Sequence, residues 1–60
     1  MNSLEVRYEL YKYLSGLARP AAFLSAEMLP PTPGEPLEIH LVTRDPMGDE
    51  RTYRVSITEL

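Results

Sequence analysis

The sequence predicts a small α+β domain in which one N-terminal helix packs on a small antiparallel sheet of two or three strands, with a hairpin at the C-terminal end. Side chains over residues 2–19 follow a helical period. A proline-rich segment at residues 30–36 excludes both helix and central strand. Two runs of alternating polar and apolar residues, 37–44 and 50–58, flank a turn sequence. Sixty residues suffice for one domain, which we place at 1–60.

The first element is expected to be a helix from Asn2 to Arg19. An alternation typical of a strand also runs over residues 4–10, but it does not continue, whereas the helical period does. Asn2 can cap this helix, because Glu5 stands three residues later in the position of a capping box. Pro20 prevents its continuation. The polar face consists of Glu5, Glu9, Lys12 and Gly16, and the apolar arc of Leu4, Tyr8, Leu10, Tyr11, Leu14, Leu17 and Ala18.

The apolar arc covers more than half of the helix circumference, which is wider than one packing surface requires. We therefore expect the helix to contact the sheet on one side and a second molecule on the other. Tyr8 and Tyr11 share a face while Tyr13 points elsewhere, and tyrosine is enriched at protein interfaces. The candidate interface residues are Tyr8, Tyr11, Tyr13 and Leu17. The alternative is that all three tyrosines line the boundary between helix and sheet in a monomer.

The middle of the chain is harder to interpret. Residues 21–29 combine helix-forming composition with an alternating pattern, so both a helix and a strand stay open, and we expect the strand. Residues 30–36 contain four prolines and one glycine. We expect a stiff connector there. The alternative is a polyproline ligand for an aromatic groove, since Pro30, Pro33 and Pro36 have the required spacing.

The C-terminal segment predicts a hairpin with a defined register. Pro46, Met47 and Gly48 fit a three-residue loop with glycine in the left-handed position, closed by Asp45 and Asp49. We expect Asp45 to accept hydrogen bonds from the backbone of its own turn. The register then pairs Leu41 with Tyr53, Ile39 with Val55 and Leu37 with Ile57 on the core face, and His40 with Arg54, Val42 with Thr52 and Arg44 with Glu50 on the solvent face.

Three short segments carry a resemblance to a known family: Leu4-Glu5-Val6-Arg7, Arg44-Asp45-Pro46-Met47-Gly48 and Ser56-Ile57-Thr58-Glu59-Leu60. In this arrangement the chain resembles a domain-of-unknown-function family of short uncharacterised proteins found in pseudomonads. The resemblance covers nearly all of the chain and implies the same order of elements, although members of that family continue into a further helix. It implies no activity, and no functional residue carries over.

Composition and charge argue against several kinds of chemistry. The net charge of -3 is not typical of a nucleic-acid binder, and the lack of cysteine excludes disulfide and thiolate chemistry. The single histidine, His40, is expected on the solvent side of the sheet beside Arg54, where nothing would exclude water from a general base. Asp45, Asp49 and Glu50 do not have the spacing of a calcium loop. We therefore expect no catalytic residue, no metal site and no cofactor.

Chain length directs the functional hypothesis. A chain this short has a small core, which favours stabilisation by a second copy. The leading hypothesis is a non-enzymatic protein–protein interaction module that self-associates as a homodimer, by analogy a small adaptor or an inhibitor such as phages encode against host machinery. The alternative is a nucleic-acid-associated regulator that uses Arg44, Arg51 and Arg54. No signal peptide or membrane span is recognisable, so we expect a cytoplasmic protein without a membrane or small-molecule partner.

Overall fold

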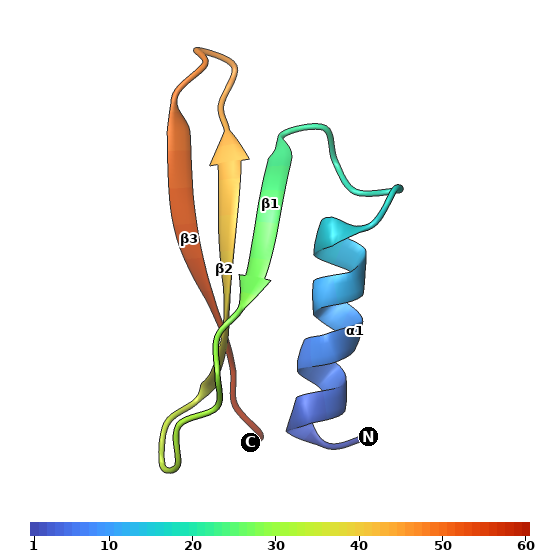
Figure 1. The fold of residues 1–60 in the computed structure, drawn as a ribbon, viewed down its shortest axis with the longest axis vertical. Helices are drawn as coiled ribbons and strands as arrows, with labels where there is room; N and C mark the ends of the chain where they lie inside the picture. The colour runs from blue at the N-terminus through green and yellow to red at the C-terminus, as the bar shows by residue number, and fades with distance from the viewer.

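The computed structural model describes residues Met1–Leu60, and it confirms the predicted α+β class. Helix α1 (Ser3–Ser15) is followed by strands β1 (Phe23–Met28), β2 (Leu37–Arg44) and β3 (Glu50–Ile57). The three strands form one antiparallel sheet in the order β1-β2-β3. As Figure 1 shows, α1 runs alongside β1 while β3 forms the far edge, and both termini lie at the same end of the molecule.

Helix α1 begins as predicted and ends earlier than predicted. The Asn2 side chain accepts a hydrogen bond from the Glu5 N–H at 2.9 Å, and the Glu5 carboxylate accepts one from the Asn2 N–H at 3.1 Å, which completes a capping box. The expected end at Arg19 is wrong, because the helix stops at Ser15 with Gly16 as its C-cap. The Arg19 guanidinium then donates to the carbonyls of Gly16 and Phe23 at 3.0 and 2.9 Å. These bonds hold the chain where it turns from α1 into β1.

The hairpin between β2 and β3 has the predicted register throughout, including the pairs Leu41–Tyr53 and His40–Arg54. Asp45 and Asp49 close the loop through a backbone bond of 2.9 Å, and Gly48 has the positive φ of 90° that the three-residue loop requires. The Asp45 carboxylate accepts from the N–H groups of Met47 and Asp49 at 3.0 and 2.9 Å. The prediction for this turn is therefore confirmed at the level of single hydrogen bonds.

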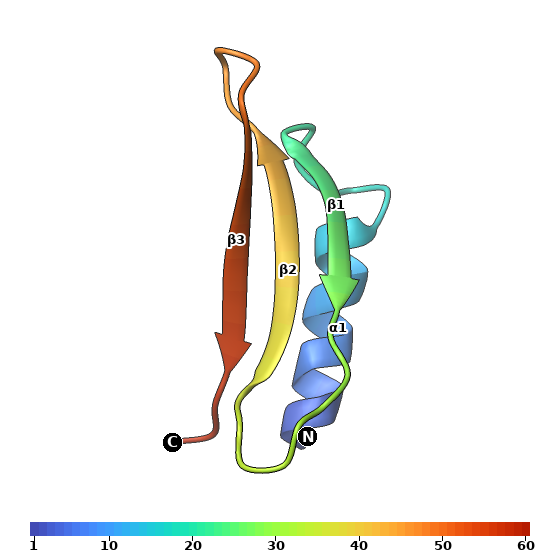
Figure 2. The ribbon, with the colours of Figure 1, turned by 60° about the vertical axis from the view of Figure 1, so that its left-hand side comes forward.

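Residues 23–28 form a strand, so the expectation for the middle segment is confirmed over most of its length. The register of β1 on β2 shifts between Phe23 and Ser25, which marks a β-bulge. Residues 30–36 connect β1 to β2 and turn back at Gly34, whose φ is 81°. In Figure 2 this connection is the loop at the lower end of the sheet. The segment thus has the place of a connector.

The core is smaller than the sequence predicts. Ile39 and Leu41 are the apolar side chains that become buried, with 0% and 7% of their surface exposed. Burial of Tyr53 against the helix was also expected, and this is wrong, because 52% of Tyr53 stays exposed. The other three side chains expected in the core are only partly buried: Leu37, Val55 and Ile57. The physical reason is the position of α1, which packs mainly on β1 and β2 and touches β3 least.

Candidate functional site

The inner face of β3, which is the face that carries Tyr53, is the part of the sheet that α1 contacts least. Side chains alternate between the two faces of a strand, and the buried residues Ile39 and Leu41 show which face of β2 meets the helix. Their cross-strand partners Val55 and Tyr53 belong to the same face. Helix α1 packs on β1 and β2 and contacts β3 least. Val55 and Tyr53 therefore have a buried neighbour on β2 and no neighbouring strand on their other side. The result is an apolar strip of Tyr53, Val55 and Ile57 along the outermost strand, with Arg51 at its hairpin end.

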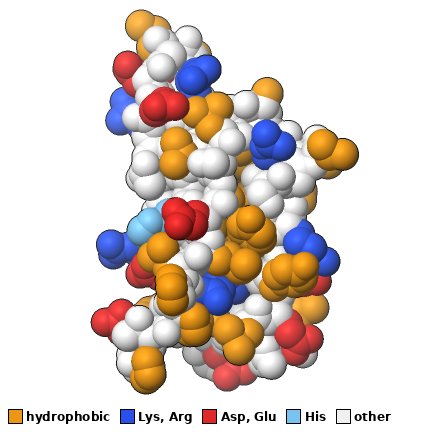
Figure 3. Space-filling view, in the orientation of Figure 1, with side chains coloured by type: hydrophobic (Ala, Val, Ile, Leu, Met, Phe, Trp, Pro, Cys, Tyr) orange, Lys and Arg blue, Asp and Glu red, His pale blue; other side chains and the backbone are white.

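One flank of α1 faces this strip. Ser3 lines a hollow together with Ile57, so its side of the helix is turned toward β3. Helical spacing places Val6, Leu10 and Tyr13 on the same side. Of these, Leu10 and Tyr13 are exposed. The inner face of β3 and this flank of α1 both expose apolar and aromatic side chains, and the hollow between Ser3 and Ile57 lies where the two meet. In Figure 3 hydrophobic side chains reach the surface over the helix and along its seam with the sheet, with charges of both signs scattered around them.

The four candidate interface residues do not form one patch. Tyr8 and Tyr13 are both exposed and lie on opposite flanks of α1, as their spacing predicts. Tyr11 lies between helix and sheet and is partly buried. Leu17 is fully exposed and follows the end of the helix, in the turn that leads to β1. The Lys12 ammonium lies 5.0 Å from the centre of the Tyr8 ring, which is the distance of a cation–π contact.

The outer edge of β3 presents backbone groups that no other strand pairs. Arg44 N–H bonds to Ala22 on the β1 side, and Asp45 N–H bonds to Asp49 on the β3 side. Backbone groups of successive residues in a strand point to opposite edges, so even-numbered residues of β2 bond to β1 and odd-numbered ones to β3. Since β3 pairs with β2 without any register shift, the odd-numbered residues of β3 complete those bonds. The residues whose N–H and C=O groups face outward are therefore Glu50, Thr52, Arg54 and Ser56.

The outer face of the sheet, opposite α1, carries a network of mixed charge. Glu38 lies between a histidine and an arginine, with its oxygens 3.6 Å from His40 Nε2 and 3.5 Å from Arg54 Nε. On the same face Arg44 lies 3.6 Å from Glu50. Arg51 lies on the inner face with Tyr53, and its Nε is 3.4 Å from Asp45 in the hairpin loop. Each of the three hairpin arginines thus has a carboxylate partner. The face is a mixed surface rather than a basic patch.

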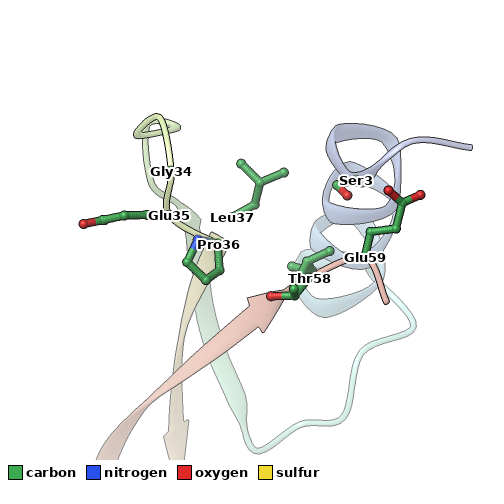
Figure 4. A pocket seen from close by; sticks show the side chains of 8 residues that line it. Ser3, Gly34, Glu35, Pro36, Leu37, Thr58 and Glu59 are labelled. Carbon is green, nitrogen blue, oxygen red and sulfur yellow. The ribbon is translucent and has the colours of Figure 1, made fainter.

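The larger of two cavities is an open hollow of about 350 Å³ between the start of α1, the β1–β2 loop and the end of β3. Four of its eight lining residues have polar side chains, and none of the eight is a histidine. In Figure 4 the Glu35 side chain extends away from the hollow, and Glu59 lies beside Ser3 on the opposite side. No group of three or more histidine and acidic side chains is placed to hold a metal ion. The single helix lacks the length and hydropathy that crossing a membrane requires.

Comparisons with known proteins give no relative, since no family model, no curated protein and no solved structure matches the chain. The resemblance to a family of pseudomonad proteins accordingly stays a prediction. The fold and the surface define a small α+β protein, one helix on a three-stranded antiparallel meander with an open outer strand.

The sequence does not predict two features of the structure, the exposure of Tyr53 and the burial of Arg7. The alternation of residues in β3 predicts which face of the sheet carries Tyr53. It does not predict which strands on that face the helix covers, and this is why the sequence places Tyr53 in the core. Arg7 is 93% buried, with only 7% of its surface exposed, although it is charged. One signal was present in the sequence: Arg7 stands three residues after Leu4 and four before Tyr11, inside the apolar arc.

Proposed function

We propose that this chain is a non-enzymatic protein–protein interaction module that associates with a second copy of itself. One observation carries the proposal: the inner face of β3 carries three apolar side chains, Tyr53, Val55 and Ile57, and α1 covers them only in part, with Tyr53 half-exposed. An apolar strip beside a core of two buried aliphatic side chains is surface that association would remove from water. Such a protein acts by binding another macromolecule, as small adaptors and inhibitors do.

The dimensions of the molecule support this proposal. A compact monomer of 6.8 kDa has an accessible surface of about 4,000 Å², and this chain exposes 4694 Å². The difference, roughly 700 Å², is close to the ~800 Å² that each partner buries in a standard interface. The radius of gyration is 12.4 Å, against about 10 Å for a compact domain of this length. A second copy would supply the cover that a single copy lacks.

Sedimentation equilibrium of the unmodified chain tests the proposal. We expect a mass near twice 6.8 kDa at micromolar concentration, with dissociation on dilution. A folded monomer at all concentrations would contradict it. Titration with single- and double-stranded DNA and RNA in low salt distinguishes the other class of function. Binding that weakens steeply with salt would overturn the proposal in favour of a nucleic-acid-associated regulator.

A further inference from the structure

We propose that two copies pair along β3, antiparallel and about a two-fold axis that passes at Tyr53, so that their sheets join into one sheet of six strands. This inference rests on the self-association proposed above and specifies its surface and its register.

The two edges of the sheet differ in how far they are protected. On β1, the bulge between Phe23 and Ser25 interrupts the strand, and Pro30 and Pro31 follow soon after its end. Bulges and prolines are the devices that prevent an edge from adding a further strand. By contrast, β3 has eight residues, no proline and no bulge. The edge at β3 is therefore the one that can accept a partner strand.

The direction of the free backbone groups limits the register. The outward N–H and C=O groups belong to the even-numbered residues of β3, and in a dimer these must lie opposite one another. A two-fold axis can satisfy this condition only if it passes at a residue, not between two residues. Near the middle of β3 the axis can pass at Thr52, Tyr53 or Arg54.

Side-chain chemistry chooses among these three positions. An axis at Arg54 places two guanidinium groups directly opposite each other, and like charges in that position are destabilising. An axis at Thr52 limits strand pairing to residues 50–54. An axis at Tyr53 extends pairing to residues 50–56 and sets the two half-exposed Tyr53 rings against each other on the inner face.

Charge is complementary in the Tyr53 register. Thr52 lies opposite Arg54 of the second copy, and Glu50 lies opposite Ser56. Glu50 is then the diagonal neighbour of the Arg54 that the second copy contributes, so an acid and a base meet on the outer face at both ends of the interface. Because the axis is perpendicular to the joined sheet, both helices lie on the same side of it. The apolar strips of the two copies become adjacent on that side of the sheet, with Arg51 of each copy opposite Val55 of the other at the ends of the strips.

Disulfide trapping tests the register directly, because the chain has no cysteine of its own. We expect an equimolar mixture of Glu50→Cys and Ser56→Cys to form a disulfide-linked heterodimer on mild oxidation, since directly opposite Cα atoms lie about 5.5 Å apart in such a pair. Either variant alone should remain largely uncrosslinked. Thr52→Cys alone would crosslink well only with the axis at Thr52, and Arg54→Cys alone only with the axis at Arg54. If Thr52→Cys alone or Arg54→Cys alone crosslinks more efficiently than the mixture of Glu50→Cys and Ser56→Cys, the Tyr53 register is wrong.

A proline substitution tests the edge without cysteine chemistry. The Thr52 N–H faces outward, so Thr52→Pro removes a donor for a partner strand and no bond to β2. We expect it to weaken self-association about tenfold or more, while Thr52→Val, which keeps the N–H, leaves association unchanged. Circular dichroism confirms that both variants are folded. Equal association of the two would contradict pairing along β3.

The same samples separate the two proposals. A dimer in sedimentation that is neither trapped by the Glu50→Cys and Ser56→Cys mixture nor weakened by Thr52→Pro retains self-association and rejects the β3 interface. A monomer in sedimentation rejects both.

Discussion

Arg7 occupies a position that helical periodicity gives to an apolar side chain. Its guanidinium lies between α1 and the sheet and donates through Nη1 to the carbonyl of Leu29 at 2.6 Å. Its Nε is buried without a hydrogen-bond partner, and no carboxylate forms an ion pair with it. A buried charge with incomplete hydrogen bonding costs free energy. We therefore expect the buried Arg7 side chain to lower the stability of the chain.

We predict that Arg7→Met stabilises the protein. Methionine keeps most of the volume, removes the charge and leaves only the Leu29 carbonyl to be satisfied by water. The free energy of unfolding in urea should rise by about 1 kcal/mol, measured at fixed protein concentration. Arg7→Lys, which keeps the charge and loses the fork of donors, is the matched control and should lower it. A decrease for Arg7→Met would show that the bond to Leu29 outweighs the cost of burial.

At the scale of single elements, the β2–β3 hairpin was predictable in full because two independent constraints agree. The Asp-Pro-x-Gly turn sets the loop, and the alternation of residues sets the faces. Helix α1 was predictable in its start and not in its end. A Cβ on Gly16 would lie 2.7 Å from the Lys12 carbonyl oxygen, so the chain leaves the helix where glycine permits a close approach. The helical period of apolar residues does not predict this contact between Gly16 and Lys12, so it does not predict where the helix ends.

We predict that Asp45→Ala destabilises the hairpin more than Asp49→Ala does. The Asp45 carboxylate accepts two backbone N–H groups of the turn, whereas Asp49 contributes backbone groups only. Loss of the two bonds should lower the free energy of unfolding by about 1–2 kcal/mol, and loss of the Asp49 carboxylate by less than about 0.5 kcal/mol. Urea titration of the two variants provides the comparison. Equal effects would mean that the turn is held by Pro46 and Gly48 alone.

At the scale of the whole molecule, the position of α1 decides which surface remains for a partner. The sequence predicts that a helix covers the sheet and says nothing of which strands it covers, because β1, β2 and β3 all present apolar side chains to it. Only the packed structure places α1 on β1 and β2. For this reason the face of Tyr53 could be predicted and its exposure could not. The sequence pattern points to the helix tyrosines, but Tyr8 and Tyr13 are exposed on opposite flanks of α1 and do not form one patch.

We predict that the melting temperature depends on protein concentration. If folded copies associate and unfolded ones do not, dilution favours unfolding by mass action. For two copies of sixty residues, a tenfold increase in concentration should raise the melting temperature by about 5 °C. Differential scanning calorimetry at two concentrations measures this, and Thr52→Pro should reduce the dependence. A melting temperature that does not move would argue for a self-sufficient single copy.

The bulge and the prolines at β1 also limit how far assembly can proceed. A sheet whose two edge strands were both unprotected could add further copies at each edge and grow into a fibre. Here the β1 edge is protected by the bulge and the prolines. After two copies join along β3, both free edges of the joined sheet are β1 edges. If two copies pair along β3 as proposed, growth would therefore stop at a dimer, and the open edge of β3 would not lead to filaments.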